Sequence, residues 1–251
     1  MRNQNQKRNI NMEQRTTQFI AFGGIKGGVG KTSLLWNYAA FLAKKDIPVL
    51  MVDCDPQRGL TALAGSLNTA MNSAQNADLI FTSNYLDCTI QLISQNCALL
   101  PGNDVLPSNG DSHYFEKWLQ YIKMQTEYQV VLFDTTSGLS ELNDLIFDHM
   151  DQIINMVTPD SLSIIANAEF KEHLTKIAVS KNKIITIGNK FTESKLSRQF
   201  QKALAKVVNK VFLPLVPDFQ TLEYNKNPLV DVIKEHCEYQ PFIDLFQSLY
   251  K

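Results

Sequence analysis

The sequence predicts an α/β protein in which a mostly parallel β-sheet is covered by helices on both faces. Strand-like and helix-like segments alternate along most of the 251 residues, as expected when each parallel strand is joined to the next by a helix. The strand-like segments are nearly continuous apolar runs, which is typical of strands buried on both faces. A glycine-rich turn at residues 23–30 joins the first of these strands to the first helix.

The expected elements follow one another in a regular order. The first strand is expected at Phe19–Phe22, the first helix at residues 34–43, and a second strand at Ile47–Asp53, which ends in acidic residues. Residues 66–97 are rich in Asn, Ser and Ala, and we expect two loose helices there. Further strands are expected at residues 98–100, 130–133, 153–157, 184–187 and 211–213.

The composition indicates a soluble globular domain rather than a membrane-spanning or disulfide-rich protein. The chain has 44% hydrophobic and 20% charged residues and a formal net charge of −1, which is ordinary for a soluble globular domain. No apolar run approaches the roughly 18–20 residues needed to span a bilayer. The four cysteines show no CxxC spacing, so we expect reduced thiols in the cytoplasm, and the four histidines lack metal-ligand spacing.

The chain is expected to form one domain with a polar extension. Residues 1–17 are rich in Asn, Gln and Arg and contain no apolar segment, so we expect a disordered tail, with Met12 as an alternative start. Residues 18–251 are expected to form the α/β domain, because no linker or internal repeat divides them.

The segment Gly23–Ser33, which reads GGIKGGVGKTS, carries the strongest chemical signal. Between a strand and a helix, such a glycine-rich loop binds phosphate, because its backbone N–H groups surround the phosphate oxygens at the start of the helix. Lys31 is expected at the β- and γ-phosphates of ATP, and Thr32 is expected to bind Mg²⁺. The residues expected to bind the cofactor here are Gly27, Gly28, Val29, Gly30, Lys31, Thr32 and Ser33.

Lys26 makes this signal more specific. The seven residues Lys26–Thr32, KGGVGKT, resemble the deviant Walker A motif of the ParA/MinD family of P-loop ATPases, and the chain is most similar to the short ParA class. The resemblance covers most of residues 18–230. It implies that Lys26 is catalytic, reaching across an ATP-dependent homodimer to the phosphates held by the other subunit. The alternative is a solvated loop lysine, the commoner position for this residue.

Acidic residues follow two of the expected strands. Residues 53–57, DCDPQ, resemble the family's switch I segment, which implies that Asp55 orients the attacking water or contacts Mg²⁺ through water. The alternative is a simple Asp-Pro turn. Asp53 is expected farther from the reacting atoms. Asp134 resembles the Walker B aspartate, which implies that it holds Mg²⁺ from the strand next to the loop.

Two further segments bear on the resemblance, one after the Walker B aspartate and one after the strand expected at residues 153–157. Residues 135–137, TTS, replace the prolines that the family usually has after the Walker B aspartate. Residues 158–160, TPD, resemble the next family landmark, and we expect them to shape the rim that faces the dimer partner.

Adenine recognition is expected from the carboxyl end of a later strand. Residues 185–189, ITIGN, resemble the family's strand end, which implies that Asn189 offers a donor and an acceptor to the base. An ordinary turn residue is the alternative. Pro217 and Asp218 resemble the segment along the adenine ring, but Pro214 has the family's usual spacing from Pro228. Which proline is equivalent stays open.

Residues 170–210 are strongly basic although the whole chain is nearly neutral. They contain ten Lys or Arg and two Glu, a local excess of +8. Four of the basic residues recur at i, i+3, i+7 and i+11, on one face of a helix: Lys195, Arg198, Lys202 and Lys206. Such a face can bind DNA phosphates without reading bases, and the resemblance places the family's DNA-binding residues in this region. A solvated helix face is the alternative.

The resemblance implies an ATPase that dimerises with ATP and Mg²⁺, binds DNA non-specifically, and partitions or positions plasmid or chromosomal DNA. Slow hydrolysis would be stimulated by a ParB-like or other adaptor protein, and the protein would be cytoplasmic and nucleoid-associated. The alternative is a positioning scaffold for a secretion, flagellar or polysaccharide-synthesis machine, without a DNA role. Membrane binding is not expected, because residues 241–251 contain a single cation and are better explained as a terminal helix packed on the sheet.

Overall fold

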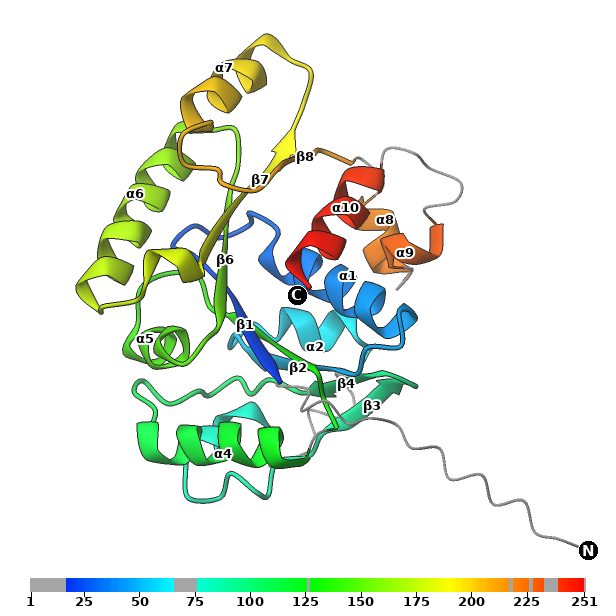
Figure 1. Cartoon of the computed structure of the whole chain (residues 1–251), viewed down its shortest axis with the longest axis vertical. Coiled ribbons are helices and arrows are strands. Elements are labelled where there is room, and N and C mark those ends of the chain that lie inside the picture. Colours follow the sequence, from blue (N-terminus) through cyan, green and yellow to red (C-terminus); the bar gives the residue numbers. More distant parts are fainter. Residues whose placement is uncertain are drawn as a thin grey trace, which may run out of the picture.

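A computed structural model of the chain describes residues 17–65, 76–125, 127–216, 219–225, 228–232 and 239–250. Within them, eight strands form one sheet in the order β3-β4-β2-β5-β1-β6-β7-β8 (Figure 1). All neighbouring strands are parallel except β3 and β4. The strands are β1 (Gln18–Gly23), β2 (Val49–Cys54), β3 (Gln91–Ser94), β4 (Cys97–Leu100), β5 (Val130–Thr135), β6 (Gln152–Val157), β7 (Ile184–Phe191) and β8 (Phe212–Pro214).

Helices cover both faces of this sheet, which confirms the predicted fold class. One layer contains α1, α9 and α10, and the other contains α4, α5 and α6 (Figure 1). The α-helices are α1 (Lys31–Lys44), α2 (Gly59–Leu63), α4 (Ser112–Gln125), α5 (Glu141–Asp148), α6 (Ser161–Lys176), α7 (Lys195–Leu204), α8 (Phe219–Tyr224), α9 (Leu229–Val232) and α10 (Gln240–Leu249), with 3₁₀ turns η1 (Ala77–Phe81) and η2 (Lys181–Lys183).

The central strands are buried on both faces, as their apolar runs predict. In β1, Ile20 and Phe22 pack into the hydrophobic core under α1 and α10, whereas Phe19 and Ala21 pack into the core under α4 and α5. This division follows from the strand geometry, in which successive side chains point to opposite faces. The sheet therefore separates two cores, and both keep β1 and its carboxyl end in a fixed position.

The expectation of two loose helices within residues 66–97 is wrong for its described part. Residues 76–97 contain the 3₁₀ turn η1 and the strand β3, and residues 66–75 lie outside the described residues. A two-residue turn at Gln95 and Asn96 returns the chain so that β3 pairs antiparallel with β4. β3 is an edge strand whose side chains alternate in exposure, since only one of its sides is paired.

The carboxyl-terminal helix α10 packs within the domain. The ring of Phe246 stacks on Tyr38 of α1 with 5.4 Å between centroids, and Phe242, Leu245 and Leu249 are buried. Its apolar face is thus explained by contact with α1 and β8, in line with the expected terminal helix. Among the described residues, no helix combines the length and apolar character that crossing a bilayer requires.

Candidate nucleotide-binding site

The predicted phosphate loop connects β1 to α1 at the carboxyl edge of the sheet. Gly28 and Gly30 have φ values of +71° and +101°, in the left-handed region where glycine carries no steric penalty. A Cβ atom at Gly30 would lie 2.7 Å from Nδ2 of Asn189, so a larger residue would clash. Gly30 occupies the N-cap of α1 and has no side chain with which to cap it. The first N–H groups of the helix therefore remain available for an anion.

Lys31 enters this site as a buried cation. Its side chain is 7% exposed, and Nζ donates to Oγ of Ser137 at 2.6 Å. Burial lowers the pKa of Lys31, although the nearby charges of Asp134 and Asp55 act in the opposite direction. A buried ammonium group is stabilised by an anionic partner, so the position suits a nucleotide phosphate.

Thr32 and Asp134, two residues predicted to hold Mg²⁺, lie in contact with each other. Asp134 lies on β5, the neighbour of β1, and its Oδ2 accepts a 2.7 Å hydrogen bond from the Thr32 hydroxyl. Its other oxygen, Oδ1, is buried without a partner. Burial, together with the negative charge of Asp53, raises the pKa of Asp134 to about 8 despite the Thr32 hydrogen bond and the charge of Lys31.

These residues fit a divalent cation. The unpartnered carboxylate oxygen is an available ligand, and a cation would offset the repulsion from Asp53. The described residues contain no group of three or more His, Cys, Asp or Glu side chains arranged around a metal. Mg²⁺ does not need one, because it is typically held by one or two protein ligands, water and nucleotide phosphates. Thr32 and Asp134 are positioned to act as these protein ligands, and Asp55 lies nearby.

Asp53 and Asp55 have different surroundings. Asp53 is fully buried, and its carboxylate accepts hydrogen bonds from the backbone N–H and the hydroxyl of Thr61 at 2.8 and 2.6 Å. It therefore holds the start of α2 rather than facing the loop. Asp55 is half-buried and accepts from the N–H of Gln57 at 2.9 Å. This is the turn that an Asp-Pro pair favours, and the Asp55 carboxylate still lies near enough to act on Lys31.

Lys26 lies at the rim of the loop and is bound by its own chain. Its Nζ donates to Oδ2 of Asp160 at 2.6 Å and to Oγ1 of Thr158 at 2.9 Å. Both partners belong to the segment that was predicted to shape the rim, between β6 and α6. Burial raises the pKa of the Asp160 carboxyl, but hydrogen bonds from Lys26 and Thr158 outweigh this effect, and the net pKa is below its ordinary value.

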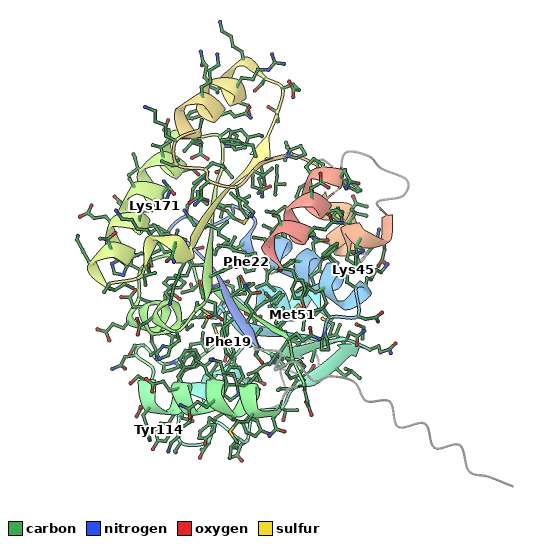
Figure 2. The ribbon with its side chains drawn as sticks, in the orientation of Figure 1. Phe19, Phe22, Lys45, Met51, Tyr114 and Lys171 are labelled. Carbon is green, nitrogen blue, oxygen red and sulfur yellow. The ribbon has the colours of Figure 1, made fainter. Side chains whose placement is uncertain are left out.

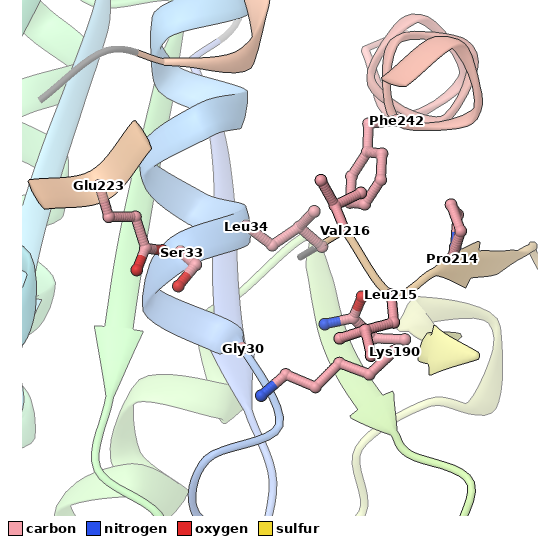
Figure 3. A pocket seen from close by; sticks show the side chains of 10 residues that line it. Gly30, Ser33, Leu34, Lys190, Pro214, Leu215, Val216, Glu223 and Phe242 are labelled. Atoms are coloured by element: carbon pink, nitrogen blue, oxygen red, sulfur yellow. The ribbon is translucent and has the colours of Figure 1, made fainter. Parts of the chain in front are cut away.

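A pocket of about 270 Å³ opens between the loop and the carboxyl ends of β7 and β8 (Figure 3). Nδ2 of Asn189 donates to the Val29 carbonyl at 2.9 Å, so its amide oxygen remains to accept a hydrogen bond. An acceptor suits the amino group of adenine better than the carbonyl of guanine. The pocket is lined by Gly30, Ser33, Leu34, Asn189, Lys190, Pro214, Leu215, Val216, Glu223 and Phe242.

The structure places Pro214 in this pocket wall, while Pro217 and Asp218 lie outside the described residues. Sequence reasoning missed Glu223 and Phe242, which come from α8 and α10. Glu223 lies in the mixed segment FQTLEY, which gave no sign of a site, and its Oε1 is buried without a partner. Phe242 carried no signal, because its apolar helix face also fits an ordinary core position.

The predicted basic face on α7 is shorter than expected. The helix ends at Leu204, so Lys206 lies in the following turn and lines a hollow of about 430 Å³ with Lys171 and Lys181. The helix ends in a turn whose Val207 and Val208 pack against the small core that contains Leu204, and the Val207 N–H bonds to the carbonyl three residues back, at Leu204. Arg198 is paired with Glu193 at 2.6 Å.

Comparison with known proteins supports the interpretation of this chain as a P-loop ATPase. The sequence model of the AAA_31 family, described as an AAA domain, matches residues 17–187. The virulence plasmid ParA family protein pGP5-D of Chlamydia trachomatis is 28% identical over 174 residues, which are 63% of this chain and 62% of that protein. The chain belongs to the ParA/MinD family of P-loop ATPases. It spans under two thirds of the length of the first curated ParA relatives.

Solved structures of ParA and MinD proteins share the fold of this family member. A putative plasmid partition protein from Borrelia burgdorferi, bound to AMPPNP, has a TM-score of 0.73 and 21% identity, covering 93% of this chain and 99% of that one. The MinD cell division protein of Aquifex aeolicus has a TM-score of 0.74 and 22% identity, covering 93% and 97%. At these identities the likeness establishes the fold.

Asp134→Asn is expected to stabilise the protein free of nucleotide and Mg²⁺, and to do so more at higher pH. Because the folded-state pKa is raised, the folded wild type keeps a proton that the unfolded chain loses, so its stability falls as pH rises from about 4 to about 8 and then levels off. Asn has no such proton. The variant should melt a few degrees higher, roughly 2–5 °C around pH 8 and less around pH 5.

Thermal denaturation in EDTA at several pH values measures this difference. The exposed Asp148 on α5 provides the control, because Asp148→Asn should show no comparable pH trend. A difference between Asp134→Asn and wild type that does not change with pH would contradict the raised pKa.

Proposed function

We propose that this chain is an ATP-hydrolysing partition protein that dimerises over two nucleotides and binds DNA non-specifically. The observation that carries the proposal is the placement of two lysines on one loop. Lys31 is buried inside the loop, where it donates to Ser137 near the charge of Asp134, whereas Lys26 is bound to Asp160 at the rim. One cation can serve the nucleotide of its own chain, and the other is placed to serve a nucleotide presented by a second copy.

ATP hydrolysis at this site would depend on positioning and charge. Phosphoryl transfer to water requires neutralisation of the phosphate oxygens and an oriented water molecule. Lys31 supplies the positive charge, and Asp55 supplies a carboxylate for the water. Thr32 and Asp134 would hold Mg²⁺, which would supply positive charge to neutralise the phosphate oxygens. Slow hydrolysis stimulated by an adaptor protein is part of the proposal.

The proposal of DNA as the cargo rests on the names of the relatives and on the distribution of charge. The matched relatives include a virulence plasmid ParA family protein and the chromosome partitioning protein ParA of Caulobacter vibrioides. Helix α7 lies at one tip of the molecule, away from α1 and α4 (Figure 1), and Figure 2 shows its side chains projecting from that tip. Lys195 and Lys202 are exposed there. This surface is accessible to a DNA duplex, whose phosphates attract cations regardless of base sequence.

Replacing Lys195, Arg198 and Lys202 with Ala is expected to weaken binding to all duplexes equally. Each lost phosphate contact should reduce the slope of log affinity against log salt by about 0.9. Electrophoretic mobility shifts with unrelated duplexes, ATP and Mg²⁺ at several salt concentrations measure this. A matched control removes three exposed lysines elsewhere, Lys45, Lys117 and Lys123, and should leave the slope nearly unchanged. Both variants should retain ATP binding.

A second candidate is a positioning scaffold that acts on a protein machine without a DNA role. The pairing of Arg198 with Glu193 and the displacement of Lys206 from the helix favour it, because they leave a smaller cationic face than the sequence predicts. If the wild-type protein with ATP and Mg²⁺ retards no DNA at low salt, the partition function is wrong and the scaffold function replaces it.

A further inference from the structure

The end of strand β7 departs from regular strand geometry. Consecutive side chains of a strand normally point to opposite faces. Between Gly188 and Phe191 the pairing of β7 with β8 shifts register, and Lys190 has φ +62°, which is uncommon for a residue other than glycine. Irregularities of this kind re-aim side chains next to functional sites.

Two consecutive side chains at this irregularity reach the same loop. Nζ of Lys190 donates to the carbonyl of Gly28 at 2.7 Å, and Nδ2 of Asn189 donates to the carbonyl of Val29 at 2.9 Å. Figure 3 shows the Lys190 ammonium group beside the loop at Gly30. Two neighbouring residues of β7 thus bind two neighbouring carbonyl groups of the phosphate loop.

These contacts orient the N–H groups of the loop. A trans peptide unit is planar, and its N–H points opposite to its carbonyl. The Gly28 carbonyl shares a peptide unit with the Val29 N–H, and the Val29 carbonyl shares one with the Gly30 N–H. When both carbonyls bond to β7, both N–H groups turn away from β7. A phosphate-binding loop needs its N–H groups free of protein acceptors and directed at the anion.

We propose that Lys190 is a positioning residue for the phosphate loop, keeping with Asn189 the Val29 and Gly30 N–H groups directed at the phosphates of ATP. The inference rests on the proposed binding of ATP at this loop. The long side chain of an exposed lysine suits the task, because its ammonium stays partly hydrated while it makes a charge-assisted hydrogen bond, stronger than one from a neutral donor. The basic charge of Lys190 thereby acts at the loop rather than in the α7 surface.

Lys190→Met, which keeps the length of the side chain but removes its donor, tests this inference. Binding of ATP and ADP in Mg²⁺, measured by calorimetric titration, is expected to weaken about tenfold, and Lys190→Arg should restore affinity to within about threefold of wild type. Lys183→Met, just before the opposite end of β7, is the matched control and should bind as wild type does. Unchanged melting temperatures show that all variants are folded.

A second measurement separates positioning from direct contact with phosphate. In the nucleotide-free protein, the amide NMR resonances of Val29 and Gly30 are expected to shift in Lys190→Met and to stay in place in Lys183→Met. If affinity falls but these resonances do not move, Lys190 acts on the nucleotide directly and the positioning role is wrong. If wild type binds ATP and Lys190→Met binds it within about twofold, the inference also fails while the ATP site stands. If wild type binds no ATP, the proposed function itself fails.

Discussion

Lys31→Ala is expected to reduce ATP affinity by about a hundredfold or more. The wild-type ammonium group is buried among polar groups, and its charge is the main one available to neutralise the β- and γ-phosphates. The shorter side chain leaves those phosphates facing the carboxylates of Asp134 and Asp55 without compensation. Equilibrium titration of a fluorescent ATP analogue in Mg²⁺ measures the loss.

The control for this variant is Lys45→Ala, just beyond the end of α1, where an exposed lysine lies over the Phe41 ring. Its ATP affinity should equal that of wild type. Circular dichroism should show that both variants are folded. Tight ATP binding by Lys31→Ala would mean that the loop between β1 and α1 is not the nucleotide site.

Lys26→Ala is expected to abolish the ATP-dependent dimer while the monomer still binds ATP within about twofold of wild type. The physical reason is the position of Lys26 at the rim, where Asp160 and Thr158 hold it. In the dimer, Lys26 would leave Asp160 and bind the phosphates of the nucleotide held by the second copy. This contact between opposite charges would stabilise the dimer strongly. Sedimentation velocity with a non-hydrolysable ATP analogue and Mg²⁺ measures the dimer.

Asp160→Asn is the companion variant for this test. Asparagine can still accept the hydrogen bond from the Ser163 N–H that caps α6, since Asn and Asp cap helices equally well. It removes the negative charge that Lys26 contacts, together with an oxygen that accepts the Thr158 hydroxyl at 2.6 Å. The variant should therefore still form a dimer, at a protein concentration roughly three- to tenfold lower than wild type needs, because the ion pair between Lys26 and Asp160 no longer has to be broken. A normal dimer of Lys26→Ala would refute the cross-subunit role.

The sequence by itself determined the fold class and the position of the glycine-rich loop that we propose binds phosphate. Glycine, lysine and threonine at fixed spacing between a strand and a helix specify a loop because backbone freedom and helix geometry act over a few residues. The apolar runs specify parallel strands for a similarly local reason. Asp134 lies on the strand next to the loop, where it was expected, because the carboxyl ends of parallel strands meet at one edge and β5 lies beside β1.

Only the tertiary structure decided the features that depend on distant segments. The expectation of helices in residues 66–97 failed where β3 pairs with β4, and Lys206 left the predicted helix face because Val207 and Val208 pack against Leu204. Strand pairing and burial override local propensity in both cases.

The same reason explains the contacts and the pocket residues that the sequence did not reveal. Lys26 meets Asp160 across 134 residues and Lys190 meets Gly28 across 162, and the pocket takes Glu223 and Phe242 from the last helices. Spacing within a motif constrains only neighbours along the chain. Contacts between remote segments depend on the order of the strands in the sheet and on the irregular end of β7, which together determine where the side chains lie.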